Sequence, residues 1–271
     1  TIKEIGMSLR INTNVEAFNA HRNLEGTSNK LAKSMERLSS GFRINRAADD
    51  AAGLAISEKL RGQIGGLAQA RRNVQDGISL VQTAEGSLTE VHSMLQRTRE
   101  LAVQWANGTL ATADRNAIVS EVRQLSDEIV RIGDTAQFNG IRLLDTAGQT
   151  ITFQVGANDR ETITVTSEQL RARVGTIDIT DAAALRNLDA SINAISDLRS
   201  SFGAVQNRLE HTYNNLSVYQ ENLSASESRI RDVDMASEMV NFTKNNILQQ
   251  AGTSMLAQAQ QAPQAVLSLL R

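Results

Sequence analysis

The chain has 271 residues with a formal net charge of −2, and 41% of its residues are apolar, enough to build a hydrophobic core. This near-neutral balance gives no electrostatic reason to expect a nucleic acid or an anionic membrane as partner. The absence of cysteine excludes disulfides, thiolate metal sites and a thiol nucleophile. With one proline and 3% aromatic residues, the chain is suited to long helices packed through aliphatic side chains.

No cleaved secretory signal peptide and no membrane segment is expected. Thr1 to Gly6 lack the apolar core and small-residue cleavage site of a secretory signal peptide. No stretch approaches about 18 continuous apolar residues, so we expect no membrane insertion. If the protein leaves the cell, a cleaved signal is not the expected route.

The N-terminal segment predicts an amphipathic helix. Leu24, Leu31 and Leu38 recur at heptad spacing, with Met35 between them, and form an apolar seam. The sequence shows no obvious core within the chain that would cover it.

Two further helices are predicted in the first half of the chain. Their apolar residues follow heptad spacing in one stripe (Val74, Val81, Leu88, Leu95, Ala102) and form a shorter second one (Ile118, Val122, Leu125, Ile129, Ile132). Gly108 and Thr109 predict a break between them, and Thr112 or Asp114 is the expected cap of the second helix.

Residues 150–166 change to a period of two. Ile151, Phe153 and Val155 alternate with polar residues, as do Ile163 and Val165. The residues between them, 156–159, are of the types that form turns, so the segment predicts a β-hairpin that flanks the bundle.

The strongest periodic signal predicts one helix from Asn187 to Val233, about 70 Å long. Its heptad stripe and the two upstream need each other as partners, which favours a mainly α fold: a long antiparallel helical bundle or coiled-coil rod with a small β-hairpin. The expected seam of this rod is Val81, Leu88, Leu95, Leu209, Leu216, Leu223 and Ile230.

The C-terminal segment carries almost no charge. Between Val240 and Leu270 the only charged residue is Lys244. A lone helix of this kind is marginal in water, so we expect both ends of the chain to fray in a monomer and to order against a partner. The residues expected to contact other copies are Leu24, Leu31, Met35, Leu38, Ile247, Leu248, Met255, Leu256, Val266, Leu269 and Leu270.

The histidines form no recognisable metal site. They are far apart in sequence and lack an HExxH motif, so we expect surface or seam positions for His21, His92 and His211. The sequence predicts no metal and no cofactor.

Two pairs of carboxylates also lack the neighbouring groups that catalysis would need. Asp49–Asp50 and Asp232/Asp234 have no nucleophile or histidine nearby. We expect them to be solvated or paired with nearby arginines (Arg43 or Arg46, and Arg229 or Arg231). Gly62, Gly65 and Gly66 follow no strand, so they predict a bend or a close helix contact and not a phosphate loop. No enzymatic activity is therefore expected.

Seven stretches of the chain are distinctive enough to compare with a known family. They are Leu9–Asn14 (LRINTN), Leu38–Ile64, Leu95–Thr109, Phe138–Leu144, Phe153–Asp159, Glu221–Met239 and Ile247–Arg271. Together they resemble bacterial flagellins, in family order and over nearly everything from Met7 onward. The resemblance implies paired terminal helices that line the inner tube of a filament, and a rod with a hairpin in the outer wall. Only Ser167–Ala184 stands where a variable outer domain would be inserted, which implies a minimal flagellin with a thin, smooth filament.

The resemblance also implies a division of the chain into domains. The expected parts are an extra leader (1–6), the N-terminal half of the inner core (7–45), the N-terminal part of the rod with hairpin 150–166 (46–180), the C-terminal part of the rod (181–235) and the C-terminal half of the inner core (236–271).

The implied function is self-assembly into the extracellular flagellar filament for motility. The implied partners are other copies of the chain, the type III apparatus that exports it unfolded, an export chaperone on the C-terminal segment, and the cap and junction proteins of the filament. Two alternatives stay open: a hook–filament junction protein with similar ends, and a non-flagellar coiled-coil scaffold or adhesin.

A host innate-immune receptor is a further implied partner. The family's arginine, leucine and glutamate of that contact correspond to Arg97, Leu101 and Glu121. The alternative is that Leu101 is merely rod surface or packing and that both charged side chains are solvated.

Overall fold

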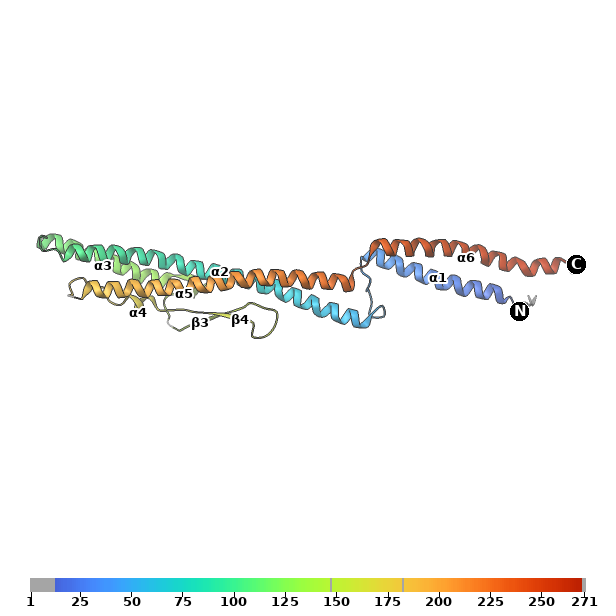
Figure 1. The fold of residues 1–271 in the computed structure, drawn as a ribbon, viewed down its shortest axis with the longest axis horizontal. Helices are drawn as coiled ribbons and strands as arrows, with labels where there is room; N and C mark the ends of the chain where they lie inside the picture. Colours follow the sequence, from blue (N-terminus) through green and yellow to red (C-terminus); the bar gives the residue numbers. More distant parts are fainter. Residues whose placement is uncertain (1–12, 147, 182, 270–271) are drawn as a thin grey trace, which may run out of the picture. The chain divides into compact units, whose positions relative to one another are not determined.

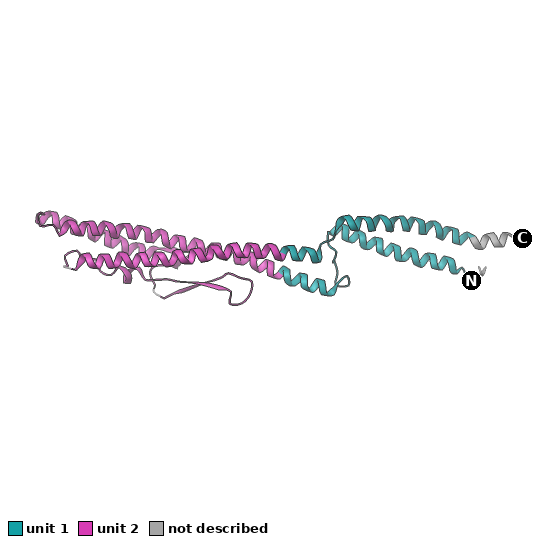
Figure 2. Cartoon of the chain, in the orientation of Figure 1, with its two compact units in different colours: residues 1–61, 224–271 teal, residues 62–223 magenta. Residues whose placement is uncertain are grey.

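The computed structural model describes residues 13–146, 148–181 and 183–269, with the side chains of 262–269 left out of the description (Figure 1). The chain divides into two compact units (Figure 2). We call the described residues up to Arg61 and from Ser224 onward the terminal unit, and residues 62–223 the central unit.

The central unit is an antiparallel bundle of three long helices. They are α2 (Ala51–Trp105), α3 (Thr112–Thr135) and α5 (Ala184–Arg231), of which α2 and α5 also extend into the terminal unit. Arg99 pairs with Asp189 and Arg71 with Tyr213, so α2 and α5 run in opposite directions. The predicted bundle is confirmed, and the long helix predicted over 187–233 is α5.

Heptad side chains form the core of this bundle. Five of them are almost inaccessible to solvent: Val74, Val81, Leu88, Leu95 and Leu209. Such a stripe is buried because a spacing of three and four residues keeps it on one helix face.

The α2–α3 connection spans residues 106–111 and contains the predicted break at Gly108 and Thr109. The prediction of the residue that caps α3 was wrong. The N-cap of α3 is Ala111, which makes no side-chain capping hydrogen bond, because Thr112 already lies in the first turn. Asp114 also lies in that turn, where a carboxylate interacts favourably with the helix dipole.

The predicted hairpin is confirmed as β3 (Thr150–Gln154) paired antiparallel with β4 (Thr162–Thr166). Ile163 and Val165 are buried, whereas the alternating threonines of β4 are exposed: Thr162, Thr164 and Thr166. This alternation packs one face of the hairpin on the helices and leaves the other face to solvent.

A second, smaller hairpin was not predicted. It joins β1 (Gln137–Phe138) to β2 (Ile141–Arg142) through Asn139 and Gly140, whose φ angles are 47° and 80°. Asn-Gly is the residue pair that a tight hairpin turn with two positive φ angles favours, so the signal was present in the sequence. A short helix, α4 (Leu170–Val174), completes the central unit.

One glycine of α2 permits the close approach of the β3–β4 turn. A Cβ atom added at Gly66 would lie 2.9 Å from the Cβ of Ala157. The expected close contact is therefore found at Gly66, whereas Gly65 beside it has open space.

These neighbours make a matched pair of variants. Gly65→Ala should raise the free energy of unfolding by about 0.5–1 kcal/mol, because alanine is the better helix former. Gly66→Ala should lower it by about 1 kcal/mol, because the methyl group displaces the turn. Urea unfolding followed by circular dichroism measures both, and equal stabilisation by the two variants would contradict the contact.

Candidate assembly surface

The terminal unit is built on an antiparallel pair of helices, α1 (Val15–Ser40) and α6 (Met235–Leu269), which lie side by side in Figure 1. Asn14 caps α1 by accepting a hydrogen bond from the Ala17 amide, and it donates one to the Ala259 carbonyl of α6 at 2.7 Å. At the other end, Gly41 closes α1 with a φ of 76°. The predicted pairing of the two chain ends is thus confirmed.

A buried polar contact joins the two helices near the α1 C-terminus. Ser34 Oγ donates a hydrogen bond of 2.5 Å to Oε1 of Glu238, and Arg37 Nη1 lies 3.5 Å from Oε2. Ser34 and Glu238 are only 4% and 6% exposed. A buried carboxylate would be costly without these partners, so a slip of one helix along the other is disfavoured.

The connections at this end are held by paired backbone. Phe42 and Asp232 form a β-bridge, and the Arg43 amide donates to the Arg231 carbonyl at 2.7 Å. Arg231 lies over the Phe42 ring and pairs with Glu58 at 2.7 Å. The two segments that lead from α1 and into α6 therefore support each other.

The expected arginine partners of the carboxylate pairs are found only in part. Asp50 lies 4.0 Å from Arg43 and also accepts a hydrogen bond from the Gly53 amide at the start of α2. Asp49 instead pairs with Lys33 of α1 at 2.7 Å. Asp234 accepts hydrogen bonds from the first amides of α6 and serves as a helix cap. The local backbone thus uses these carboxylates as caps and turn acceptors, which sequence spacing did not reveal.

Among the carboxyl groups of this region, Asp49 has the pKa that departs most from its ordinary value. The hydrogen bond from Lys33 and those from the Arg46 and Asn45 amides lower the pKa of Asp49 from 3.8 to about 2. Its ionised form therefore ties α1 to the segment that leads into α2.

Apolar side chains remain uncovered on the outside of the α1–α6 pair. Ile247 lies about two and a half turns after the buried Glu238, which places it on the side of α6 opposite α1. It is 61% exposed, and Val240, on the same side, is 68% exposed. On α1, Phe18 is 70% exposed. α6 therefore has apolar residues around its axis, of which α1 covers one side only.

The predicted inter-copy residues fall into three groups. Four are exposed: Met35, Ile247, Leu248 and Met255. Four are half-buried: Leu24, Leu31, Leu38 and Leu256. Leu270, and the side chains of Val266 and Leu269, lie outside what the structure describes.

The sequence interpretation missed other members of this surface. Val15, Phe18, Met235, Met239 and Val240 are exposed apolar residues of the same two helices. They lie off the heptad seam, so a search for seam positions passed over them. The low charge of α6 all around its axis was the signal that could have found the three residues on that helix.

Two shallow apolar hollows, both largely open to solvent, lie on the described part of this unit. One is lined by Asn14, Ala17, Phe18, His21, Leu256 and Gln260. The other is lined by Met239, Val240, Thr243, Lys244 and Ile247 of α6 alone.

The residues expected at the rod seam all lie on α2 and α5. Val81, Leu88, Leu95, Leu209 and Leu216 are buried, whereas Leu223 and Ile230 are half-buried.

The expected receptor residues lie together on the central unit. Arg97 pairs with Glu121 of α3 at 3.0 Å, and this hydrogen bond raises the pKa of Arg97. Their side chains are 52% and 45% exposed, whereas Leu101 is only 2% exposed and packs in the core. A receptor contact at these residues stays a prediction.

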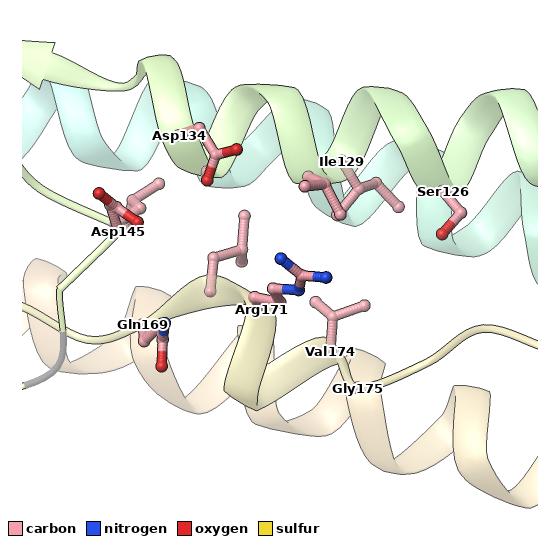
Figure 3. Close-up of a pocket in the computed structure, with 12 residues that line it drawn as sticks. Ser126, Ile129, Asp134, Asp145, Gln169, Arg171, Val174 and Gly175 are labelled. Atoms are coloured by element: carbon pink, nitrogen blue, oxygen red, sulfur yellow. The ribbon is translucent and has the colours of Figure 1, made fainter.

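A small crevice of the central unit offers little room for a ligand (Figure 3). It measures about 70 Å³ and is lined by polar residues that include Asp134, Asp145, Gln169 and Arg171. Sites for small molecules usually measure about 300–1,000 Å³, so this volume suits a few waters. Asp145 is already paired with Arg142 at 2.6 Å.

The described ranges contain no cluster of three or more histidine or acidic side chains that could hold a metal ion. His21 and His211 are exposed, and His92 contacts Gln96. None of the described helices has the length and hydropathy needed to cross a membrane.

A helical bundle and an incompletely covered apolar helix pair are features of a structural protein. Comparison with known proteins agrees. The bacterial flagellin N-terminal helical region matches residues 11–149, and the bacterial flagellin C-terminal helical region matches residues 185–270.

Curated relatives match over almost the whole chain. A flagellin of Halalkalibacterium halodurans is 57% identical over 270 residues, covering 96% of this chain and 99% of that protein. A flagellin of Bacillus subtilis is 51% identical over 304 aligned residues, covering 97% and 100%. The crystal structure of Bacillus cereus flagellin is 35% identical and matches with a TM-score of 0.50, covering 54% of this chain and 88% of that one.

The chain belongs to the bacterial flagellin family. It is a structural subunit of the extracellular flagellar filament, and not an enzyme. This membership favours the filament subunit over a junction protein or an adhesin.

The ion pair of Asp49 predicts a pH dependence. Because its folded-state pKa is depressed, the stabilisation is complete above the unfolded value of 3.8 and is lost as the pH falls through about 2. Lys33 is half exposed, so the contribution is on the order of 1–2 kcal/mol.

Asp49→Asn should therefore destabilise the protein at pH 5 and make little difference at pH 2. Urea unfolding at both pH values measures this. Asp127→Asn, at an exposed position of α3, is the control and should change stability little at either pH. An equal loss for Asp49→Asn at both pH values would contradict the ion pair.

Proposed function

We propose that the outer face of the α1–α6 pair is the surface through which copies of this chain join into a filament. We call it the assembly surface, and it comprises Val15, Phe18, Met35, Met235, Met239, Val240, Ile247, Leu248 and Met255. The observation that carries the proposal is the exposure of Val240 and Ile247 on the side of α6 that α1 cannot reach. The half-buried Leu24, Leu31, Leu38 and Leu256 hold the pair together and set the face that neighbours meet.

The size of this surface suits a stable contact. A large apolar side chain that becomes fully buried contributes about 1.5–3 kcal/mol. Association costs on the order of 4–15 kcal/mol in lost freedom of motion. One exposed side chain cannot offset that cost, whereas the joint burial of several can.

The two hollows of the terminal unit favour an open assembly. Contacts between unlike surfaces continue into a helix, whereas a self-complementary contact closes a dimer. The hollow at Phe18 involves both helices and the hollow at Val240 only α6, so one copy offers two different surfaces. This arrangement supports head-to-tail growth.

A charge at the centre of the assembly surface should stop growth. Val240→Asp should raise the monomer concentration needed to elongate filament seeds by about 100-fold or more, because burying a carboxylate costs several kcal/mol that an ion pair with Lys244, one turn away, does not recover. Val240→Leu is the matched control and should elongate normally. Light scattering measures elongation, and circular dichroism checks that both variants remain helical. Normal elongation by helical Val240→Asp would remove Val240 from the interface.

We also propose the partners that handle the subunit before assembly. An uncovered apolar helix would associate prematurely in the cytoplasm, so an export chaperone covers the C-terminal segment, 235–271. Type III export in the unfolded state through an uncleaved N-terminal signal, a cap at the growing tip and junction proteins at the base complete this proposal. The exposed apolar residues of α6 are the observation that supports a chaperone on this segment.

The exposed Arg97–Glu121 pair is our proposed contact for a host innate-immune receptor on the isolated subunit. The two charged side chains are exposed enough for a direct contact with the receptor. The buried Leu101 would act indirectly, by holding α2 in position beneath this pair.

Two nearby arginines allow a controlled test of this contact. Arg97→Ala should reduce receptor signalling by the monomer at least tenfold. Arg99→Ala should change it less than threefold, because Arg99 lies about 200° around α2 and pairs with Asp189. A reporter-cell assay measures both, and equal effects would contradict a local contact.

A further inference from the structure

The methionines of this chain are unevenly exposed. Four of them lie on the α1–α6 pair, where Met35, Met235, Met239 and Met255 are 56%, 48%, 50% and 62% exposed. By contrast, Met94 of α2 is partly buried against the core of the central unit. Oxidants in solution can therefore reach the thioethers of the terminal unit most easily.

These four side chains belong to the assembly surface. Met239 lines the same hollow as Val240 and Ile247. Met255 directly precedes Leu256, which lines the other hollow together with Phe18. A change of polarity at the Met239 sulfur would thus alter the hollow at Val240, and a change at Met255 would make the exposed surface beside Leu256 more polar.

We propose that Met35, Met235, Met239 and Met255 form a modification site at which peroxides oxidise the free subunit and block its incorporation into a filament. This inference rests on the proposed assembly surface. The occupant of that surface is a second copy of the chain, whose contact would shield the same thioethers once the filament has formed.

The chemistry is a two-electron oxygen transfer. The sulfur lone pair attacks one oxygen of hydrogen peroxide, an S–O bond forms and the O–O bond breaks. A proton moves to the departing oxygen, so that thioether and peroxide become sulfoxide and water. The sulfur is oxidised and the peroxide reduced, with no further reactant.

Oxidation to the sulfoxide changes the polarity and hydration of the side chain at the contact. A flexible apolar side chain gains a strong hydrogen-bond acceptor, which remains hydrated on the free subunit. Burial against an apolar neighbour would strip that hydration without providing a donor. Oxidation should therefore weaken association while leaving the helix pair folded.

The test compares oxidised and untreated monomer in seeded elongation. Hydrogen peroxide should oxidise the four methionines before Met94, as peptide mass spectrometry reports, and reduce the elongation rate at least tenfold. The same methionines in assembled filaments should oxidise at least tenfold more slowly. Methionine sulfoxide reductases should restore elongation of the oxidised monomer. This part of the test uses the chain without any amino-acid substitution.

A variant with Met35→Leu, Met235→Leu, Met239→Leu and Met255→Leu should elongate at the same rate before and after treatment, whatever its untreated rate is relative to the unsubstituted chain. It retains Met7 and Met94, so a loss of elongation after treatment would assign the effect elsewhere and overturn the proposal. Full oxidation of the four without slower elongation would overturn it too, as would failure of complete sulfoxide reduction to restore growth. Val240→Asp tests the assembly surface without oxidation, so the two proposals can fail separately.

Discussion

The antiparallel contact between α1 and α6 is the interaction on which this account depends. Two helices can cover only one side of each other, and α6 is apolar on the far side as well. The same pairing that orders the ends of the chain therefore leaves Val240 and Ile247 in water. In the assembly that we propose, filament formation follows from the ordinary tendency of such side chains to leave water.

The two units illustrate two uses of aliphatic side chains. In the central unit the heptad residues of α2 and α5 are buried within one chain, and Val81, Leu88 and Leu209 are fully covered. In the terminal unit the helix pair has a polar contact, Ser34 with Glu238, at a buried position. Such a contact contributes register, whereas the uncovered apolar residues are the driving force in the association that we propose.

Periodicity predicted the elements with long repeats. The stripe through Leu209 and Leu216 identified α5, and the alternation of Ile163 and Val165 identified β4, because each period reports which face is buried. The β1–β2 hairpin was missed because two-residue strands have no measurable period. The Lys33–Asp49 pair and the cap at Ala111 depend on the backbone geometry around these residues. The exposure of Phe18 depends on how much of α1 is covered by α6. The pattern of residues along the chain reports neither the backbone geometry nor the extent of this coverage.

Hydrogen exchange of α1 and α6, followed by mass spectrometry in dilute monomer and in assembled filaments, tests the central claim most directly. The account predicts that amides of both helices exchange measurably faster in the monomer than in the filament, with little change in the core of α2. Equal protection of α1 and α6 in the monomer and in the filament would show that assembly covers neither helix further. That result would contradict assembly through an uncovered helix face.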